Sequence, residues 1–114
     1  MSVLSPTKRK LVNNAVSAYF ISSLDTTKEQ AESTFQVNVL GALYMVQAVV
    51  PHMPRGGRII NISTVASKIG PDILSVYGAS KAALDSLTYS WAGEVRSTHY
   101  RGSRPERTMQ LIQL

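Results

Sequence analysis

The residues best suited to acid–base chemistry are a tyrosine and a lysine four positions apart, Tyr77 and Lys81. Residues at this spacing share one face of a helix, so the phenol and the ammonium would be neighbours. A free phenol has a pKa of about 10, and a nearby positive charge favours the phenolate; a drop of about three units corresponds to roughly 4 kcal/mol. We therefore expect Lys81 to lower the pKa of Tyr77 and make it a usable proton donor or acceptor. The alternative is an ordinary surface pair, because the spacing alone is common.

Two hydroxyl residues, Ser63 and Thr64, end a run at 58–64 that is rich in β-branched residues and therefore predicts a strand. In open parallel sheets, ligands bind at the carboxyl ends of the strands. A hydroxyl there would face the same crevice as a tyrosine at the start of the following helix. More often, such residues only end a strand and satisfy loop backbone.

Two long helices are expected to position these groups. The first begins near Lys28, where Thr27 and Gln30 can form a capping box, and continues until Pro51 ends it. One face is predicted from four residues at helical spacing: Ala31, Phe35, Asn38 and Ala42. Asn38 is the polar member, and a buried amide without hydrogen-bond partners would cost about 1–3 kcal/mol.

The second helix is predicted over residues 76–96. Its apolar surface is assigned to Ala79, Ala82, Ala83, Leu87, Trp91 and Val95. A short apolar run at Leu11 and Val12 suits the end of a buried strand. The order strand, helix, strand, helix predicts an α/β fold, a fragment of a Rossmann-like doubly wound parallel sheet: a βαβα unit with irregular ends. Parallel strands need neighbours on both edges, so we expect this unit to belong to something larger.

Composition and charge limit the other functions. The chain has no cysteine, and His52 and His99 are far apart, so no metal site is expected. The formal net charge of +5 is concentrated at residues 8–10 and 96–107, without interleaved aromatic residues, so we expect no nucleic-acid partner. The longest apolar stretch, 39–53, is interrupted and too short to cross a bilayer. A cytoplasmic protein without a membrane partner is the expectation.

Four segments share an order and spacing over residues 11–98. They read Leu-Val-Asn-Asn-Ala at 11–15, Val-Asn-Val-Leu-Gly at 37–41, Gly-Arg-Ile-Ile-Asn-Ile-Ser-Thr-Val-Ala at 57–66 and Tyr-Gly-Ala-Ser-Lys-Ala-Ala-Leu at 77–84. Together they resemble the motifs of the single-domain short-chain dehydrogenases/reductases. The resemblance implies an oxidoreductase that uses NAD or NADP on a small carbonyl or alcohol substrate.

The resemblance also implies catalytic roles. Tyr77 would give a proton to a carbonyl oxygen, or take one from an alcohol, as hydride passes to or from nicotinamide. Lys81 would lower the tyrosine pKa and bond the nicotinamide ribose, and Asn38 would hold a water in a proton relay to Lys81. The family's catalytic serine falls on Thr64, which keeps the hydroxyl but adds a methyl that restricts its rotamer. Thr64 is therefore preferred over Ser63.

A second group of matching residues would border the adenosine side of the cofactor and steady the sheet: Asn13, Asn14 and Ala15. Val16 departs from the family, which favours glycine there. The glycine-rich turn that receives the pyrophosphate is not found among the glycines of this chain, and neither is the strand expected after the second helix. Dinucleotide binding is therefore expected to be impaired.

The expected organisation has three parts: a non-matching basic segment at 1–10, the catalytic half of a domain at 11–98 and a non-matching tail at 99–114. An alternative to an active enzyme is an inactive, truncated fragment that acts as an interaction module. The two long helices are those through which the family often dimerises, so the chain could form homo- or hetero-oligomers through them.

Overall fold

The structure, a computed structural model, describes residues 2–4, 10–53, 57–96 and 108–113. Its strands form one sheet in the order β1-β2-β3-β4. They are β1 (Ser2–Leu4), β2 (Lys10–Asn13), β3 (Arg58–Ser63) and β4 (Thr108–Gln113). β2, β3 and β4 are parallel, and β1 is antiparallel to β2. The predicted α/β class with a parallel sheet is confirmed.

The first long helix begins as predicted at a capping box. The Thr27 hydroxyl accepts a hydrogen bond from the Gln30 amide (3.1 Å), and the Gln30 side chain accepts one from the Thr27 amide (3.0 Å). The helix consists of α1 (Lys28–Phe35), a π-helical turn η2 (Gln36–Leu40), α2 (Gly41–Val49) and a 3₁₀ turn η3 (Val50–His52) that contains Pro51. The second long helix is α4 (Ser75–Arg96). A short 3₁₀ turn η1 (Ser23–Asp25) precedes α1, and the short helix α3 (Ala66–Ile69) precedes α4.

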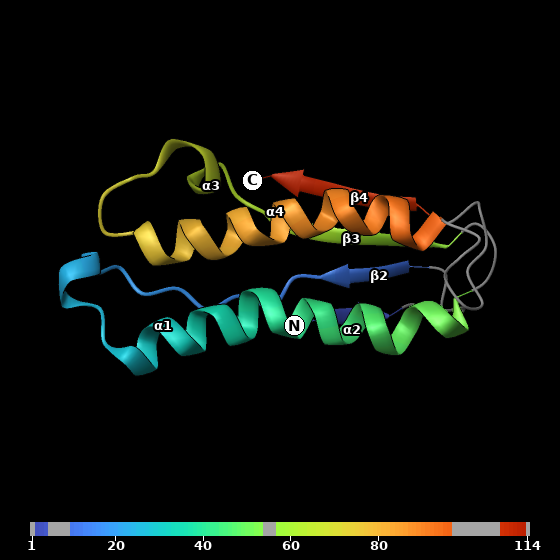
Figure 1. The fold of residues 1–114 in the computed structure, drawn as a ribbon, viewed down its shortest axis with the longest axis horizontal. Helices are drawn as coiled ribbons and strands as arrows, with labels where there is room; N and C mark the ends of the chain where they lie inside the picture. Colours follow the sequence, from blue (N-terminus) through green and yellow to red (C-terminus); the bar gives the residue numbers. More distant parts are fainter. Residues whose placement is uncertain (1, 5–9, 54–56, 97–107, 114) are drawn as a thin grey trace.

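Both long helices pack on the same face of the sheet. Leu11 and Ile59 are register partners in β2 and β3, both fully buried, and they share one core cluster with Val46 of α2 and with Leu84 and Trp91 of α4. Figure 1 shows the two helices side by side, running opposite to β2, β3 and β4. The carboxyl ends of β2 and β3 therefore lie at the same end of the molecule as the amino ends of α1 and α4.

The other face of the sheet is less well covered. Side chains alternate along a strand, so Val12 and Ile60, also register partners, point away from the helices, and both are only half-buried. A parallel sheet normally has both faces covered.

The prediction of irregular ends was wrong at two places. Residues 2–4 form β1, and residues 108–113 form the strand after the second helix that the sequence analysis did not find. β4 pairs with β3 along its whole length, from Arg58↔Thr108 to Ser63↔Gln113. The free edges of β2 and β3 present unpaired backbone donors and acceptors, and a short extended segment satisfies them even without a strong strand pattern.

The π-helical turn changes which side of the first helix is buried. The sequence analysis placed Phe35 on the buried face, but it is 37% exposed, whereas Thr34 is 2% exposed. Buried positions instead recur four residues apart, at Thr34, Asn38, Ala42 and Val46. A π turn holds more residues than an α turn, so the regular spacing predicted for an unbroken helix fails across it.

The continuous helical segment Lys28–His52 has a window of mean hydropathy 1.3, so by length and composition it could cross a membrane. The apolar run 39–53 inside this segment was expected to be too short to cross a bilayer. Its side chains Val46, Val49 and Val50 are buried in the core against the sheet. Apolar core helices commonly pass the same test.

Candidate active site

The turn after β3 and the first turn of α4 bring two predicted site residues together. Thr64 follows the last residue of β3, and Tyr77 lies near the start of α4; their side chains are hydrogen-bonded to one another. Ser63 points elsewhere: its hydroxyl is buried and has no hydrogen-bond partner among the described residues. Of the two candidate hydroxyls, Thr64 is thus the one beside the phenol.

Lys81 lies one turn further along α4 but does not lower the pKa of Tyr77 in this structure. Its side chain is buried, and its ammonium donates a hydrogen bond to the Ile62 carbonyl (2.9 Å). Burial raises the pKa of Tyr77 above its ordinary value, and the hydrogen bond from Thr64 opposes that rise. The expected lowering of this pKa by Lys81 was therefore wrong for the isolated chain. Burial also lowers the pKa of Lys81, against which the charge of Asp85 acts.

Asn38 lies in the middle of the π turn and is almost fully buried. Its amide oxygen accepts from the Ser17 backbone N–H (2.8 Å), and its nitrogen donates to the Ser17 carbonyl (2.8 Å) and to the Ser80 hydroxyl (3.0 Å). These bonds account for a buried amide in mid-helix and use both of its N–H groups. A water held by this side chain would have to bond to the remaining lone pair of Oδ1.

Ser80 connects Asn38 to the turn that carries Tyr77. Its hydroxyl is fully buried and donates to the Tyr77 carbonyl (2.6 Å) while it accepts from Asn38. The loop after β2, the π turn and the start of α4 are therefore joined by side-chain hydrogen bonds. Ser80 was not predicted as a site residue, because a serine before a lysine carries no signal of its own.

The residues predicted to border the cofactor divide into buried and exposed members. Asn13 is buried and donates to Asn61 of β3 (2.8 Å), whose own amide nitrogen donates to the Thr88 hydroxyl of α4 (2.9 Å). Asn13 therefore joins β2 to β3, and Asn61 joins β3 to α4. Asn14 is exposed and Ala15 half-buried.

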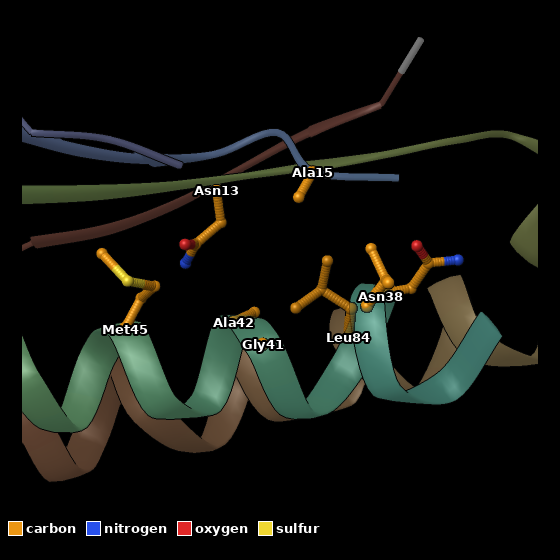
Figure 2. Close-up of a pocket in the computed structure, with 8 residues that line it drawn as sticks. Asn13, Ala15, Asn38, Gly41, Ala42, Met45 and Leu84 are labelled. Atoms are coloured by element: carbon orange, nitrogen blue, oxygen red, sulfur yellow. The ribbon is translucent and has the colours of Figure 1, made fainter. Parts of the chain in front are cut away.

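A cavity of about 220 Å³ lies between the end of β2 and the first long helix. Figure 2 shows Asn13 and Ala15 on the strand side, with Asn38, Gly41, Ala42 and Met45 on the helix side. Three predicted site residues, Asn13, Ala15 and Asn38, thus line one space. Thr64, Tyr77 and Lys81 do not line it; they form a separate group at the end of β3.

A family model described as short chain dehydrogenase matches residues 9–101 of this chain. The chain belongs to the short chain dehydrogenases. The match includes every candidate site residue, from Asn13 to Lys81.

Relatives and solved structures agree with this family. The chain is 47% identical over 88 residues to the short chain dehydrogenase penD of Penicillium thymicola, an alignment that covers 73% of this chain and 32% of that protein. Its fold is similar to a short chain dehydrogenase/reductase of Burkholderia phymatum in complex with NAD (TM-score 0.78, 27% identity, 92% of this chain and 37% of that one). It is also similar to the angucycline C-6 ketoreductase LanV with bound NADP (TM-score 0.71, 31% identity, 74% and 33%). The chain spans about a third of the length of these proteins.

The buried face of α4 in this short chain dehydrogenase is largely polar. Its members include four polar or charged residues, Ser80, Lys81, Asp85 and Thr88, each at most 4% exposed. Of the apolar residues predicted for this surface, Trp91 is buried as expected, whereas Ala79 is exposed. Apart from Lys81, these polar residues were not predicted to be buried, because the buried face was assigned from apolar side chains alone. A polar stripe at steps of four and three residues was the signal that could have revealed them.

A second cavity, of about 430 Å³, lies between the loops that follow β2 and β3. Ile73 lines it with φ 56°, a left-handed conformation that is strained for a β-branched residue. Its carbonyl accepts a hydrogen bond from the Ile21 amide (2.9 Å), and the Ser23 and Ser75 hydroxyls bond beside it. The described residues contain no group of three or more His, Asp or Glu that could hold a metal ion.

Gly78 allows α4 to approach the turn that carries Thr64. A Cβ at this position would lie 2.8 Å from the Ala66 carbonyl oxygen. We expect Gly78→Ala to destabilise the fold by about 1–3 kcal/mol, because the clash with backbone outweighs the better helix propensity of alanine. Urea denaturation, followed by circular dichroism, measures the change.

Gly93 provides the matched control in the same helix. A Cβ there would meet nothing within 4 Å, so Gly93→Ala should stabilise the chain by up to about 1 kcal/mol. Two alanine variants that change the free energy of unfolding in the same direction would contradict the close approach at Gly78.

Proposed function

We propose that this chain is the catalytic part of an NAD(P)-dependent oxidoreductase that transfers hydride between nicotinamide and a small carbonyl or alcohol substrate. The observation that carries the proposal is the hydrogen-bonded pair Thr64 and Tyr77 at the carboxyl end of β3, with the buried Lys81 one turn along the same helix. The carboxyl ends of parallel strands are where ligands bind in such sheets.

In carbonyl reduction, the substrate oxygen would accept hydrogen bonds from the Thr64 and Tyr77 hydroxyls. Tyr77 then gives its proton to that oxygen as the carbonyl carbon receives hydride. Burial raises the pKa of Tyr77 in the isolated chain, so the phenol is protonated at neutral pH but is a weaker acid than catalysis favours, since catalytic groups work best with a pKa near the operating pH. Alcohol oxidation needs the phenolate instead, and a positive charge close to the phenol would favour it.

The described residues fit the nicotinamide half of a dinucleotide. Tyr77 and Lys81 offer a hydroxyl and an ammonium to the nicotinamide ribose, once Lys81 exchanges its bond to the Ile62 carbonyl. The bound nicotinamide would supply or accept the hydride. For the pyrophosphate, no described strand leads through a glycine-rich turn into a helix: β2 continues as Asn14-Ala15-Val16, and β3 as Thr64-Val65-Ala66.

A dinucleotide titration tests the cofactor side of this proposal. We expect the purified 114-residue chain to bind NADH or NADPH no more tightly than millimolar, because none of its described strands leads through a glycine-rich turn into a helix. Nucleotide fluorescence and calorimetry would measure the affinity, with AMP as a control for binding of the adenosine half alone. A micromolar dissociation constant for the chain would show that another segment holds the pyrophosphate. Translating the flanking DNA in all frames shows whether a glycine-rich turn is encoded upstream.

A second candidate function is association through the two long helices. Large apolar side chains are exposed on both of them: Phe35 (37%), Tyr44 (51%) and Tyr89 (66%). Exposed aromatic residues are enriched at protein–protein interfaces. Co-purification with a full-length relative, lost in the Tyr44→Lys/Tyr89→Lys variant, would support an interaction module. A monomeric chain that captures nothing would contradict it.

A further inference from the structure

Two side chains behind the proposed site join the turn that carries Thr64 to the helix that carries Tyr77. The Ser67 hydroxyl of α3 lies 2.7 Å from Oδ2 of Asp85 in α4 and 2.8 Å from the Thr64 carbonyl oxygen. Asp85 is 4% exposed. A buried carboxylate needs hydrogen bonds that compensate its lost hydration, and the Ser67 hydroxyl provides one to Oδ2.

The position of Asp85 relates it to Lys81 as well. It lies one turn beyond Lys81, and its charge raises the pKa of that lysine against the effect of burial. The Lys81 ammonium is bonded to the carbonyl of Ile62, two residues before Thr64. Two polar contacts from α4 therefore hold the segment 62–67, one on each side of Thr64.

We propose that Ser67 and Asp85 are positioning residues: their hydrogen bond holds the turn after β3 at the distance from α4 at which the Thr64 hydroxyl reaches Tyr77. The inference rests on the proposed function for its catalytic meaning. The geometric part concerns this chain alone and needs neither cofactor nor substrate.

The pKa of Tyr77 reports on this arrangement, because a hydrogen bond from Thr64 stabilises the phenolate. Ser67→Ala removes the contacts of this hydroxyl with Asp85 and with the Thr64 carbonyl oxygen, and it leaves every charge in place. We expect the pKa of Tyr77 to rise by about half a unit to one unit, the equivalent of one hydrogen bond. Ser67→Thr, which keeps the hydroxyl, should leave the pKa unchanged, and so should the control Ser86→Ala at an exposed position of α4.

Fluorine NMR of chains labelled with difluorotyrosine, which titrates closer to neutrality than tyrosine, would measure the pKa. The chain has five tyrosines, and Tyr77→Phe identifies the signal. The Thr64→Ala/Ser67→Ala double variant tests the route: it should show the same pKa as Thr64→Ala alone, because Ser67 acts through Thr64.

Two results would overturn the proposal: an unchanged Tyr77 pKa in folded Ser67→Ala, or additive shifts in the double variant. If Ser67→Ala does not fold, Ser67→Cys preserves the volume with a weaker donor and should raise the pKa by a smaller amount. A failure of the proposed oxidoreductase function would leave these titrations unaltered, so the two failures are distinguishable.

Discussion

Tyr77→Phe is expected to lower the rate of carbonyl reduction about 10²–10⁴-fold, because it removes the proposed proton donor and leaves the rest of the site in place. The loss should appear in kcat rather than in the affinity for the dinucleotide. The assay follows NADH or NADPH consumption with a panel of small ketones, in a form of the protein that includes a glycine-rich turn.

Tyr89→Phe is the matched control for this change. Tyr89 lies on the same helix and is 66% exposed, so the loss of its hydroxyl should leave the rate within about twofold. Circular dichroism of both variants would show that each keeps its fold. A Tyr77→Phe protein that retains most of its rate would remove Tyr77 from the mechanism.

Asn61→Ala is expected to destabilise the chain by about 2–5 kcal/mol. Asn61 is fully buried and bonds both to Asn13 of β2 (2.8 Å) and to Thr88 of α4 (2.9 Å). Its removal takes a partner from two buried polar groups, at about 1–3 kcal/mol each, and leaves a cavity. Native domains are stable by only about 5–15 kcal/mol, so the loss would be large. Urea denaturation gives the free energy of unfolding.

Asn14→Ala serves as the control because Asn14 has the same side chain but is exposed. Its effect on stability should stay within about 0.5 kcal/mol. If the two substitutions cost the same, the Asn13–Asn61–Thr88 hydrogen bonds do not hold the sheet to the helix. A double variant with Thr88→Val would then show whether the two ends of the network are coupled.

The order of elements was predictable from local signals. The capping box at Thr27 and Gln30 and the β-branched run before Thr64 each act within a few residues, and both are found as predicted. Near the expected stop at Pro51, the α-helix ends at Val49, and a 3₁₀ turn that contains Pro51 continues to His52. The edge strands were not predictable in this way. β1 and β4 exist because neighbouring strands need backbone partners, which is a property of the assembled sheet.

The candidate site was predictable only in part, because local signals place its residues but do not give their surroundings. Thr64 and Tyr77 do lie together, because the end of a strand and the start of the next helix must meet at one edge. The direction of the Tyr77 pKa was not predictable from the spacing of Tyr77 and Lys81. Burial and the Ile62 carbonyl, which occupies the ammonium, become visible only in three dimensions.

The π turn at Gln36–Leu40 sets the rotation of the side chains of α1 relative to those of α2. Each residue advances an α-helix by about 100°, so a residue inserted beyond those that the π turn already holds would rotate everything before it relative to everything after it. Asn38 could then no longer reach Ser17 and Ser80 while Val46 stayed in the core. Conservative substitutions within the turn should thus be tolerated far better than an insertion.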